Sequence, residues 1–365
     1  MPNPLHADKR SSEAPTMLAE CAVQTHPMSR QQGYVVVVGS SAGGIEALKR
    51  LVAELPADFN APIFIVQHVA ANFASILPEI LTRAGKLPAR HPQDGELIEA
   101  PGIYIAPPDC HMLIRDGRVE VKRGPKENRY RPSIDVLFRS AAYMYRNRTI
   151  GIVLSGALND GTSGLWLIKR LGGTAIVQHP EDATYPSMPM SALKDVEVDH
   201  ALPAPKIAEV LMTKITQPPS NQVSASDAEL RRIEIERAIA AGKTPLEAGV
   251  LELGEPSHYA CPECHGVLGR IQEGDTMRYR CHTGHAYSQE ALLTSMYLNR
   301  DETLSKAVTA LEESAMLLEE IGNRLKSDEN AADADYYCER AKMTKELVKG
   351  VRELQQQGLG RSASV

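Results

Sequence analysis

The sequence lacks the features of a membrane protein or of a small disulfide-rich secreted protein. No apolar run approaches the ~20 residues that a membrane-spanning helix needs. Residues 1–32 show no charged start followed by an apolar stretch, as a secretory signal would. The six cysteines are too few and too unevenly spread for a secreted disulfide framework. These absences predict a cytoplasmic protein without membrane insertion.

An excess of positive charge is also missing. The chain has 40 Lys and Arg against 46 Asp and Glu, so its formal net charge is −6 and it has no global attraction to nucleic acid. The composition is 43% hydrophobic and 24% charged, which excludes a wholly disordered chain. At about 150 residues per domain, 365 residues predict two folded units plus something smaller. We expect no nucleic-acid partner.

Apolar runs alternate with amphipathic stretches over residues 33–216. The runs are short, continuous and rich in Val and Ile, as in strands buried on both faces of a parallel sheet. They lie at 34–38, 62–67, 102–106, 149–156 and 173–178. Helices are expected at 44–55, 72–85, 133–146, 161–171 and 205–214. The alternation predicts an α/β fold, doubly wound around a mainly parallel sheet, with right-handed crossovers. A hairpin is expected at 111–122, turning at Asp116-Gly117.

Composition divides the rest of the chain. The predicted segments are a disordered arm at 1–32, a linker at 217–227, a short helical connector at 228–256, a cysteine-bearing module at 257–288, amphipathic helices at 289–357 and a frayed tail at 358–365. In the helical part, apolar residues repeat at spacings of four and three, and a second helix at 333–357 is expected to fold back on the first. The linker predicts that the module is independent of the α/β domain.

A candidate nucleophile lies at a strand–turn–helix junction. The stretch 35–48, VVVVGSSAGGIEAL, leaves a buried strand through glycines and enters a helix. Gly39–Gly43 matches the G-x-S-x-G elbow with Ser41 at its centre. Phosphate binding at the helix N-terminus is a competing interpretation, but the G-x-G-x-x-G spacing is missing. The third interpretation is a tight turn in which Ser41 has no catalytic role.

A serine becomes a strong nucleophile only when a base accepts its proton. His68 follows the next predicted strand, and Asp160 lies in a glycine-bracketed loop after a later one. Strands of an open α/β sheet share one crevice at their carboxyl ends, so we expect these residues near Ser41. Asp160 is predicted to accept from His68 Nδ1 and fix the tautomer. The alternatives are a structural histidine and a helix-capping aspartate. The order Ser–His–Asp argues against an α/β-hydrolase.

Five blocks carry a resemblance to a known family. They are GSSAGG (39–44), QH (67–68), GIYIAPPDCHM (102–112), NRYRPSIDVLF (128–138) and SGALNDGTSG (155–164). With them, residues 34–215 resemble the catalytic domain of the chemotaxis protein-glutamate methylesterases, the CheB family. The resemblance implies a hydrolase of glutamyl methyl esters on chemoreceptors that often also deamidates receptor glutamines. It places the catalytic residues at Ser41, His68 and Asp160 and implies no catalytic cofactor.

The chain departs from the pattern of that family in three places. The family commonly has Thr after the nucleophile and Met-Gly before Asn-Asp-Gly, where this chain has Ala42 and Ala157-Leu158. The lost hydroxyl is expected to weaken the oxyanion hole, in which one donor can matter by about 10²-fold, whereas backbone N–H groups survive. The best-known members carry an N-terminal phospho-receiver domain. Only 32 unpatterned residues precede the first strand, so we expect no phospho-aspartate control in cis.

Two arginines lie beside a proline-fixed turn in the NRYRPS block. Arg129 and Arg131 are candidates for binding a carboxylate-rich receptor helix; the alternative is pairing with local acids. Asp135 is expected in the first turn of the following helix, where it favours the helix dipole.

Residues 257–288 hold a set of candidate metal ligands. Cys261-x-x-Cys264 precedes a hairpin predicted to turn at 273–275, after which come Cys281 and His285. This spacing predicts tetrahedral zinc with Cys₃His ligation, a closed structural site that supplies the stability of the module. The rival fourth ligands, His265 and His282, each directly follow a cysteine, which is a strained arrangement. A redox CxxC is the other alternative, but a thioredoxin-like context is missing.

Two classes of function compete. The first is a serine hydrolase acting on methyl-accepting chemoreceptor proteins. The second is a non-catalytic chemosensory scaffold that uses the same groove. Other chemosensory proteins are expected partners of the helices at 289–357, for which core or dimer packing is the alternative. Nucleotide binding at 39–44 is disfavoured by the missing spacing.

Overall fold

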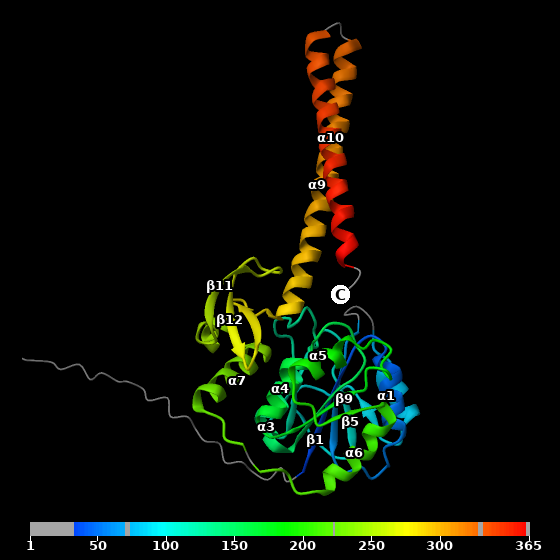
Figure 1. Ribbon diagram of the computed structural model, residues 1–365, viewed down its shortest axis with the longest axis vertical. Helices are drawn as coiled ribbons and strands as arrows, with labels where there is room; N and C mark the ends of the chain where they lie inside the picture. Colours follow the sequence, from blue (N-terminus) through cyan, green and yellow to red (C-terminus); the bar gives the residue numbers. More distant parts are fainter. Residues whose placement is uncertain (1–32, 70–73, 222, 328–330, 363–365) are drawn as a thin grey trace, which may run out of the picture. The chain divides into compact units, whose positions relative to one another are not determined.

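The computed structural model describes residues 33–69, 74–221, 223–327 and 331–362 (Figure 1). The chain divides into two units, 1–32 and 33–365. The predicted disordered arm at 1–32 lies outside the described residues.

A seven-stranded parallel sheet forms the centre of the α/β domain. Its strand order is β10-β9-β8-β1-β2-β5-β3, and all its neighbouring strands run parallel. The strands are β1 (Val35–Ser40), β2 (Pro62–Gln67), β3 (Ala89–Arg90), β5 (Gly102–Ile105), β8 (Thr149–Val153), β9 (Thr174–Gln178) and β10 (His200–Leu202). On one side of β1 the chain adds β2, then the edge strand β3, and then β5 between them; on the other side it adds β8, β9 and β10 in order. The predicted doubly wound fold is confirmed, and its switch point lies between β1 and β8.

Helices cover both faces of this sheet (Figure 1). The valines of β1 alternate between two cores: Val36 and Val38 face one, Val35 and Val37 the other. The first core is closed by α1 (Gly44–Ala53), α2 (Leu77–Ala84) and α6 (Ala204–Thr216). The second is closed by α3 (Ile134–Tyr145), α4 (Thr162–Arg170) and α5 (Ser187–Asp195). Because β1 is covered on both faces, apolar residues are required at consecutive positions, and the run of valines at 35–38 meets this requirement.

A small antiparallel sheet lies beside the parallel one. It consists of β4 (Glu96–Leu97), β7 (Arg118–Lys122) and β6 (His111–Arg115), in that order. Asp116 and Gly117 have φ of 47° and 75°, the left-handed values that the predicted two-residue turn requires. The strands β3, β4 and β10 were not predicted, because strands of two or three residues leave no periodic pattern. The helix α5 was not predicted either.

A four-stranded antiparallel ribbon follows the connector helices. After α7 (Asp227–Ala240), α8 (Pro245–Ala248) and the short helix η2 (Val250–Glu252), its strands run in chain order. They are β11 (Glu255–Ala260), β12 (Val267–Glu273), β13 (Thr276–Cys281) and β14 (Ala286–Ser288). The turn between β12 and β13 lies at Gly274-Asp275, within the stretch expected from the sequence.

The ribbon is joined to the α/β domain through buried charges. Arg278 and Arg280 of β13 pair with Glu236 of α7 at 2.8 and 2.9 Å, and Arg280 reaches Glu127 at 2.5 Å. Arg139 of α3 pairs with both glutamates at 3.2 Å. All five side chains are almost fully buried, so separating the ribbon would leave uncompensated charges. The expectation of a module that is independent of the α/β domain is wrong.

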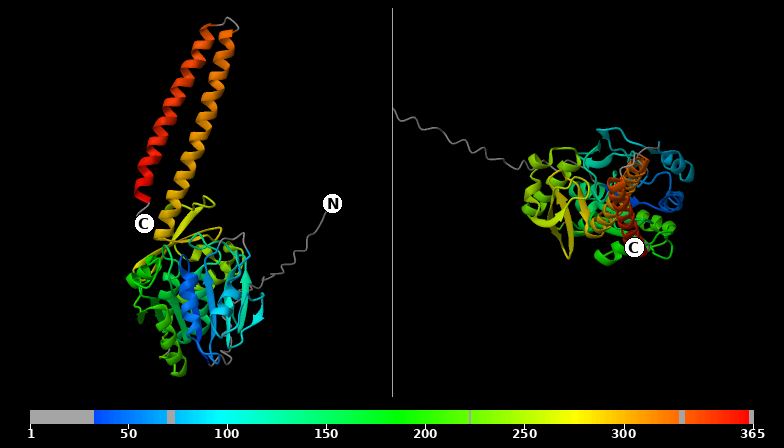
Figure 2. Two further views of the ribbon diagram at one scale, coloured as in Figure 1. Left: turned by 90° about the vertical axis from the view of Figure 1, so that its right-hand side faces the viewer. Right: turned by 90° about the horizontal axis from the view of Figure 1, so that it is seen from above.

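Two long helices end the described chain. α9 (Gln289–Ser327) and α10 (Ala331–Ser362) lie side by side as an antiparallel hairpin (Figure 2). The predicted fold-back is confirmed, but the frayed tail at 358–365 is wrong up to Ser362, because the helix continues through Gly358 and Gly360. Residues 363–365 lie outside the described residues. None of the described helices is long and apolar enough to cross a bilayer.

Candidate active site and Cys/His cluster

Ser41 lies directly after β1, in the turn that leads into α1. Gly43 takes φ of 71° there, and a Cβ on Gly44 would come within 2.6 Å of Ser40 Cβ and of Gln67 Oε1. The Ser41 N–H donates to Ser155 O at 2.9 Å, which ties the turn to the end of β8. The glycines thus permit a tight elbow that leaves Ser41 partly exposed at the carboxyl edge of the sheet.

His68 follows β2 and faces Ser41. Its Nδ1 is 3.1 Å from Ser41 Oγ. Gln67 fixes both strand ends, because its Nε2 donates to Ser41 O at 2.8 Å and to His68 O at 2.9 Å. Its Oε1 accepts from the buried Ser40 Oγ at 2.7 Å. Gln67 was not predicted to take part in the site, because its only signal in the sequence is its place before the histidine.

Asp160 completes the chain of contacts. Its Oδ2 lies 2.9 Å from His68 Nε2 and accepts from Ile134 N at 2.7 Å. Its Oδ1 accepts from Asn128 Nδ2 at 2.8 Å and from Ser133 Oγ at 2.9 Å. Burial raises the pKa of Asp160, but these hydrogen bonds, first that of His68, outweigh it and lower the pKa to about 2. The carboxyl group of Asp160 is therefore ionised at neutral pH.

The ring of His68 is oriented opposite to the prediction. We expected Nδ1 to face Asp160, but Nε2 faces the carboxylate and Nδ1 faces Ser41. Tyr130 stacks on the imidazole at a centroid distance of 3.7 Å, with an interplanar angle of 10°. With Nε2–H donating to the carboxylate, the lone pair of Nδ1 is free to accept the Ser41 proton. The roles are unchanged, and only the two nitrogens are exchanged.

A second carboxyl group, Asp135, lies buried beside this chain. It occupies the first turn of α3 as expected, and it accepts from Gly164 N at 2.7 Å and from Asn128 Nδ2 at 2.8 Å. Burial and the neighbouring Asp160 charge raise the pKa of Asp135 to about 8. Asp135 is thus mainly neutral at pH 7, and it links α3 and α4 rather than acting only on a helix dipole.

The loop expected to serve the oxyanion lies against the serine. A Cβ on Gly156 would come within 2.9 Å of Ser41 Cβ. Ala157 is exposed, and Ala42 is partly exposed. Within the described residues, the backbone N–H groups of Ala42 and Ala157 have no acceptor, whereas that of Gly156 donates to Tyr185 O. Both N–H groups are therefore available to a bound oxyanion.

The two candidate arginines differ. Arg131 pairs with Asp109 at 2.6 Å and donates to Gly124 O at 2.8 Å, so its guanidinium is occupied by local groups. Arg129 takes φ of 74° and is partly exposed. It has no ion pair within the part of the chain that the structure describes.

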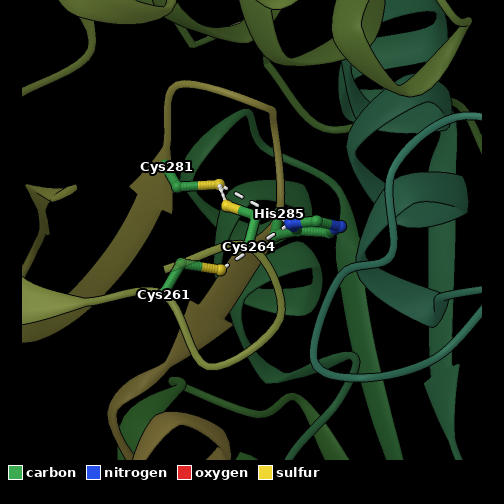
Figure 3. A group of neighbouring side chains, drawn as sticks. All are labelled: Cys261, Cys264, Cys281 and His285. Carbon is green, nitrogen blue, oxygen red and sulfur yellow. Dashed lines mark hydrogen bonds between the residues drawn. The ribbon is translucent and has the colours of Figure 1, made fainter. Parts of the chain in front are cut away.

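The ligand atoms of Cys261, Cys264, Cys281 and His285 all lie within 4.8 Å of one another (Figure 3). Cys264 Sγ is 3.6 Å from Cys281 Sγ, and His285 Nδ1 is 3.7 Å from the Sγ atoms of Cys261 and Cys281. Zinc–sulfur bonds of about 2.3 Å place tetrahedral sulfurs about 3.8 Å apart, so the spacing fits. His265 and His282 are exposed and lie outside this group.

Two tight turns and a carboxylate orient these ligands. His265 N donates to Cys261 O at 2.9 Å, and Gly284 N donates to Cys281 O at 2.9 Å. His285 Nε2 lies 3.4 Å from Glu263 Oε2. A carboxylate on the outer nitrogen keeps the proton there and leaves the Nδ1 lone pair facing the thiols, as in metal-ligating histidines. The side chains present therefore fit a zinc ion.

The residues after His285 reach the supports of Asp160. Ser288 N donates to Asn128 Oδ1 at 2.7 Å. Asn159 Oδ1 accepts from Ser288 Oγ at 2.7 Å, and Asn159 Nδ2 donates to Glu290 Oε2 at 2.7 Å. No sequence signal pointed to Asn128 or Asn159 in this role, because their partners lie more than a hundred residues away in the chain.

Comparison with known proteins identifies the family. Residues 36–211 match the model of the CheB methylesterase family. A protein of Leptospira interrogans, provisionally named a protein-glutamate methylesterase/protein-glutamine glutaminase, is 40% identical over 178 residues, 48% of this chain and 92% of that protein. The chain belongs to the CheB methylesterase family. The family that the sequence motifs indicated is therefore confirmed.

The chain is also similar to a named protein and to a solved structure from Thermotoga maritima. The T. maritima protein-glutamate methylesterase/protein-glutamine glutaminase is 36% identical over 184 residues, which are 49% of this chain and 54% of that protein. The chain thus spans about half the length of that CheB relative. The crystal structure of the T. maritima CheB methylesterase catalytic domain has 35% identity and a TM-score of 0.49, and the match covers 50% of this chain and 99% of that one. The ribbon and the two long helices lie beyond the family match.

Proposed function

We propose that this CheB-family chain hydrolyses glutamyl methyl esters of chemoreceptors in the cytoplasm, and that Ser41 is its nucleophile. The observation that carries the proposal is the unbroken line of contacts from Ser41 Oγ to His68 Nδ1 at 3.1 Å and from His68 Nε2 to Asp160 at 2.9 Å. Such a line is the arrangement that activates a serine for acyl transfer. The scaffold alternative has no comparable observation in its favour.

In the first half of the proposed reaction, Ser41 Oγ attacks the ester carbonyl while His68 Nδ1 takes its proton. The resulting imidazolium keeps its Nε2–H on Asp160, whose low pKa holds the compensating charge in place. The N–H groups of Ala42 and Ala157 stabilise the oxyanion. The tetrahedral intermediate then expels the methoxy group, which leaves as methanol after His68 returns the proton.

In the second half, water attacks the acyl-enzyme and His68 again serves as the base. The intermediate collapses with Ser41 as the leaving group, which regenerates the hydroxyl and releases a receptor glutamate. A receptor glutamine would follow the same course with ammonia in place of methanol. Side chains of His68 and Asp160 that are only 5% and 1% exposed keep bulk water from competing for these hydrogen bonds.

We further infer that Cys261, Cys264, Cys281 and His285 hold one structural zinc ion. Three thiolates and one imidazole nitrogen are a preferred donor set for Zn²⁺, and four protein ligands leave no position for a reacting water. When bound, the ion would supply stability to the ribbon rather than chemistry at Ser41. No catalytic step in this proposal involves the metal.

A covalent probe tests the nucleophile. The full-length protein is treated with a fluorescent fluorophosphonate, digested and mapped by mass spectrometry, and in parallel assayed for methanol release from methylated receptors. We expect label on Ser41, no label in Ser41→Ala, and undiminished labelling in a variant of an exposed serine such as Ser220→Ala. Label at another site, or methanol release without any reactive serine, would contradict the proposal.

A further inference from the structure

Within the described residues, the helical hairpin carries a line of large apolar side chains that remain exposed to solvent. On α10, the four large members of this line are each more than half exposed: Tyr336, Met343, Leu347 and Leu354. Their spacings of seven, four and seven residues put them on one side of a helix with 3.6 residues per turn. We call this line and the α9 surface beside it the apolar edge.

Ion pairs mark the opposite edge of the hairpin. Lys345 of α10 pairs with Glu319 of α9, and Arg352 pairs with Glu312. At about 100° per residue, the apolar line of α10 lies within about 20° of the direction opposite Lys345. On α9, the exposed residues Ala310 and Leu317 lie opposite Glu319 by the same rotation. The hairpin thus has one polar edge and one apolar edge.

The hairpin buries little apolar surface of its own. Along the described parts of α9 and α10 beyond residue 300, the buried side chains are small: Val308, Ala315, Ala334, Ala341 and Val348. Holding two helices of 39 and 32 residues in place costs conformational entropy that such a thin seam offsets poorly. Leu304, Leu311, Leu318 and Ile321 of α9 are only partly buried, so burial against a surface outside this hairpin would add stability.

The two helices α9 and α10 differ in charge and in the size of their exposed side chains. Apart from the two ion pairs of the polar edge, residues 307–322 of α9 contain two further glutamates and no Lys or Arg. Residues 340–352 of α10 contain three further Lys and Arg and one glutamate. The two ion pairs show that these stretches lie at the same level. The apolar edge is correspondingly lined by large side chains on the basic helix. On the acidic helix it includes three small exposed residues, Ala307, Ala310 and Ser314, and one large one, Leu317.

We propose that the apolar edge is the surface through which two copies of this chain pair, forming a four-helix bundle. A two-fold axis brings α9 of one copy against α10 of the other. The acidic helix then meets the basic one, and the large side chains meet the small ones. A different helical protein would need one acidic helix with small exposed side chains and one basic helix with large ones to fit this surface. A second copy of this chain has both. The inference does not depend on the esterase proposal.

Light scattering coupled to size-exclusion chromatography tests the pairing on the full-length protein. One chain has a mass of 39.8 kDa, so we expect about 80 kDa. The double variant Met343→Glu with Leu347→Glu should run as a monomer, because four carboxylates would be buried at the two-fold interface. Its circular dichroism should be unchanged, since both positions are exposed in the single chain.

The matched control is Met316→Glu. Met316 is 68% exposed, but it lies about 60° from Glu319, outside the apolar edge, so this variant should remain a dimer. A monomeric wild-type protein would overturn the proposal and leave the edge to a helix of another protein. The proposal would also be overturned if the double variant stayed dimeric, or if Met316→Glu dissociated the dimer as completely as the double variant does.

Discussion

The side-chain amide of Asn128 donates a hydrogen bond to Asp160 Oδ1 at 2.8 Å. The oxygen of the same side chain accepts from the N–H of Ser288, in the last strand of the ribbon, at 2.7 Å. One asparagine therefore connects the proposed triad of this CheB-family enzyme with the segment that follows the Cys/His cluster. A hydrogen bond from a neutral amide also leaves the charge of Asp160 on the carboxylate, where the His68 imidazolium needs it.

Variants of the neighbouring residues Ser40 and Ser41 distinguish a catalytic role from a structural one. Ser41→Ala removes the hydroxyl that faces His68, so we expect esterase turnover to fall by roughly 10³-fold or more with the fold intact. Ser40→Ala removes a buried hydrogen bond to Gln67, which costs about 1 kcal/mol of stability and leaves most of the turnover. Methanol release from a methylated receptor measures both. Equal losses in the two variants would contradict the assignment of the nucleophile.

Asp135 should make stability fall as the pH rises. Its folded pKa of about 8 lies above the unfolded value of 3.8, so between these pH values the folded state binds a proton that the unfolded state has lost. The contribution of this group is complete below the unfolded pKa and is lost up to about pH 8, with a slope of at most about 1.4 kcal/mol per pH unit. Above pH 8 its effect levels off.

Asp135→Asn removes that proton exchange. Urea unfolding from pH 5 to pH 8 should show a steeper loss of unfolding free energy in the wild type than in the variant, whatever the offset between the two curves. The comparison of slopes removes the other titrating groups, which both proteins share. Parallel curves would show that Asp135 is ionised in the folded protein.

The sequence indicated the parts of the site that depend on local pattern. Val35–Val38 marked a strand buried on both faces, and strand ends indicated Ser41, His68 and Asp160, which the fold does bring together. The exchange of the two His68 nitrogens escaped prediction, because the choice of nitrogen depends on where Asp160, 92 residues away in the chain, contacts the ring. No periodicity encodes that contact.

The attachment of the ribbon was missed for a similar reason. Arg280 and Glu127 are 153 residues apart in the chain and looked like ordinary surface charges, yet both are buried and paired. A Pro- and Ser-rich stretch at 217–227 indicated a linker, and such a composition says nothing about what lies on either side of it. Only the folded arrangement shows that the two parts share a buried ion cluster.

Asn128→Gly tests the support of Asp160 directly. Asn128 has φ of 50°, which glycine adopts without strain, so the variant removes the side-chain amide and leaves the backbone at ease. We expect kcat toward a small ester to fall between about 10-fold and 100-fold, because His68 and Asp160 lose their alignment. Asn147→Ala, which removes an amide bound to Ser220 O in the 217–227 segment, is the control and should leave kcat unchanged. An unchanged kcat in Asn128→Gly would exclude a positioning role.

Removing the metal should lower the activity without abolishing it. We expect about one zinc per chain by elemental analysis, and loss of that zinc in Cys281→Ser but not in Cys338→Ser, whose thiol lies on α10 outside the cluster.

Because Ser288 follows His285 by three residues and holds Asn128, loosening the cluster should release the support of Asp160. Chelation should therefore reduce kcat about as much as Asn128→Gly does, and far less than Ser41→Ala. The two effects should not multiply when chelation is applied to Asn128→Gly, since both remove the same contact. Full activity in the metal-free protein, or losses that multiply, would show that the cluster and the triad are uncoupled.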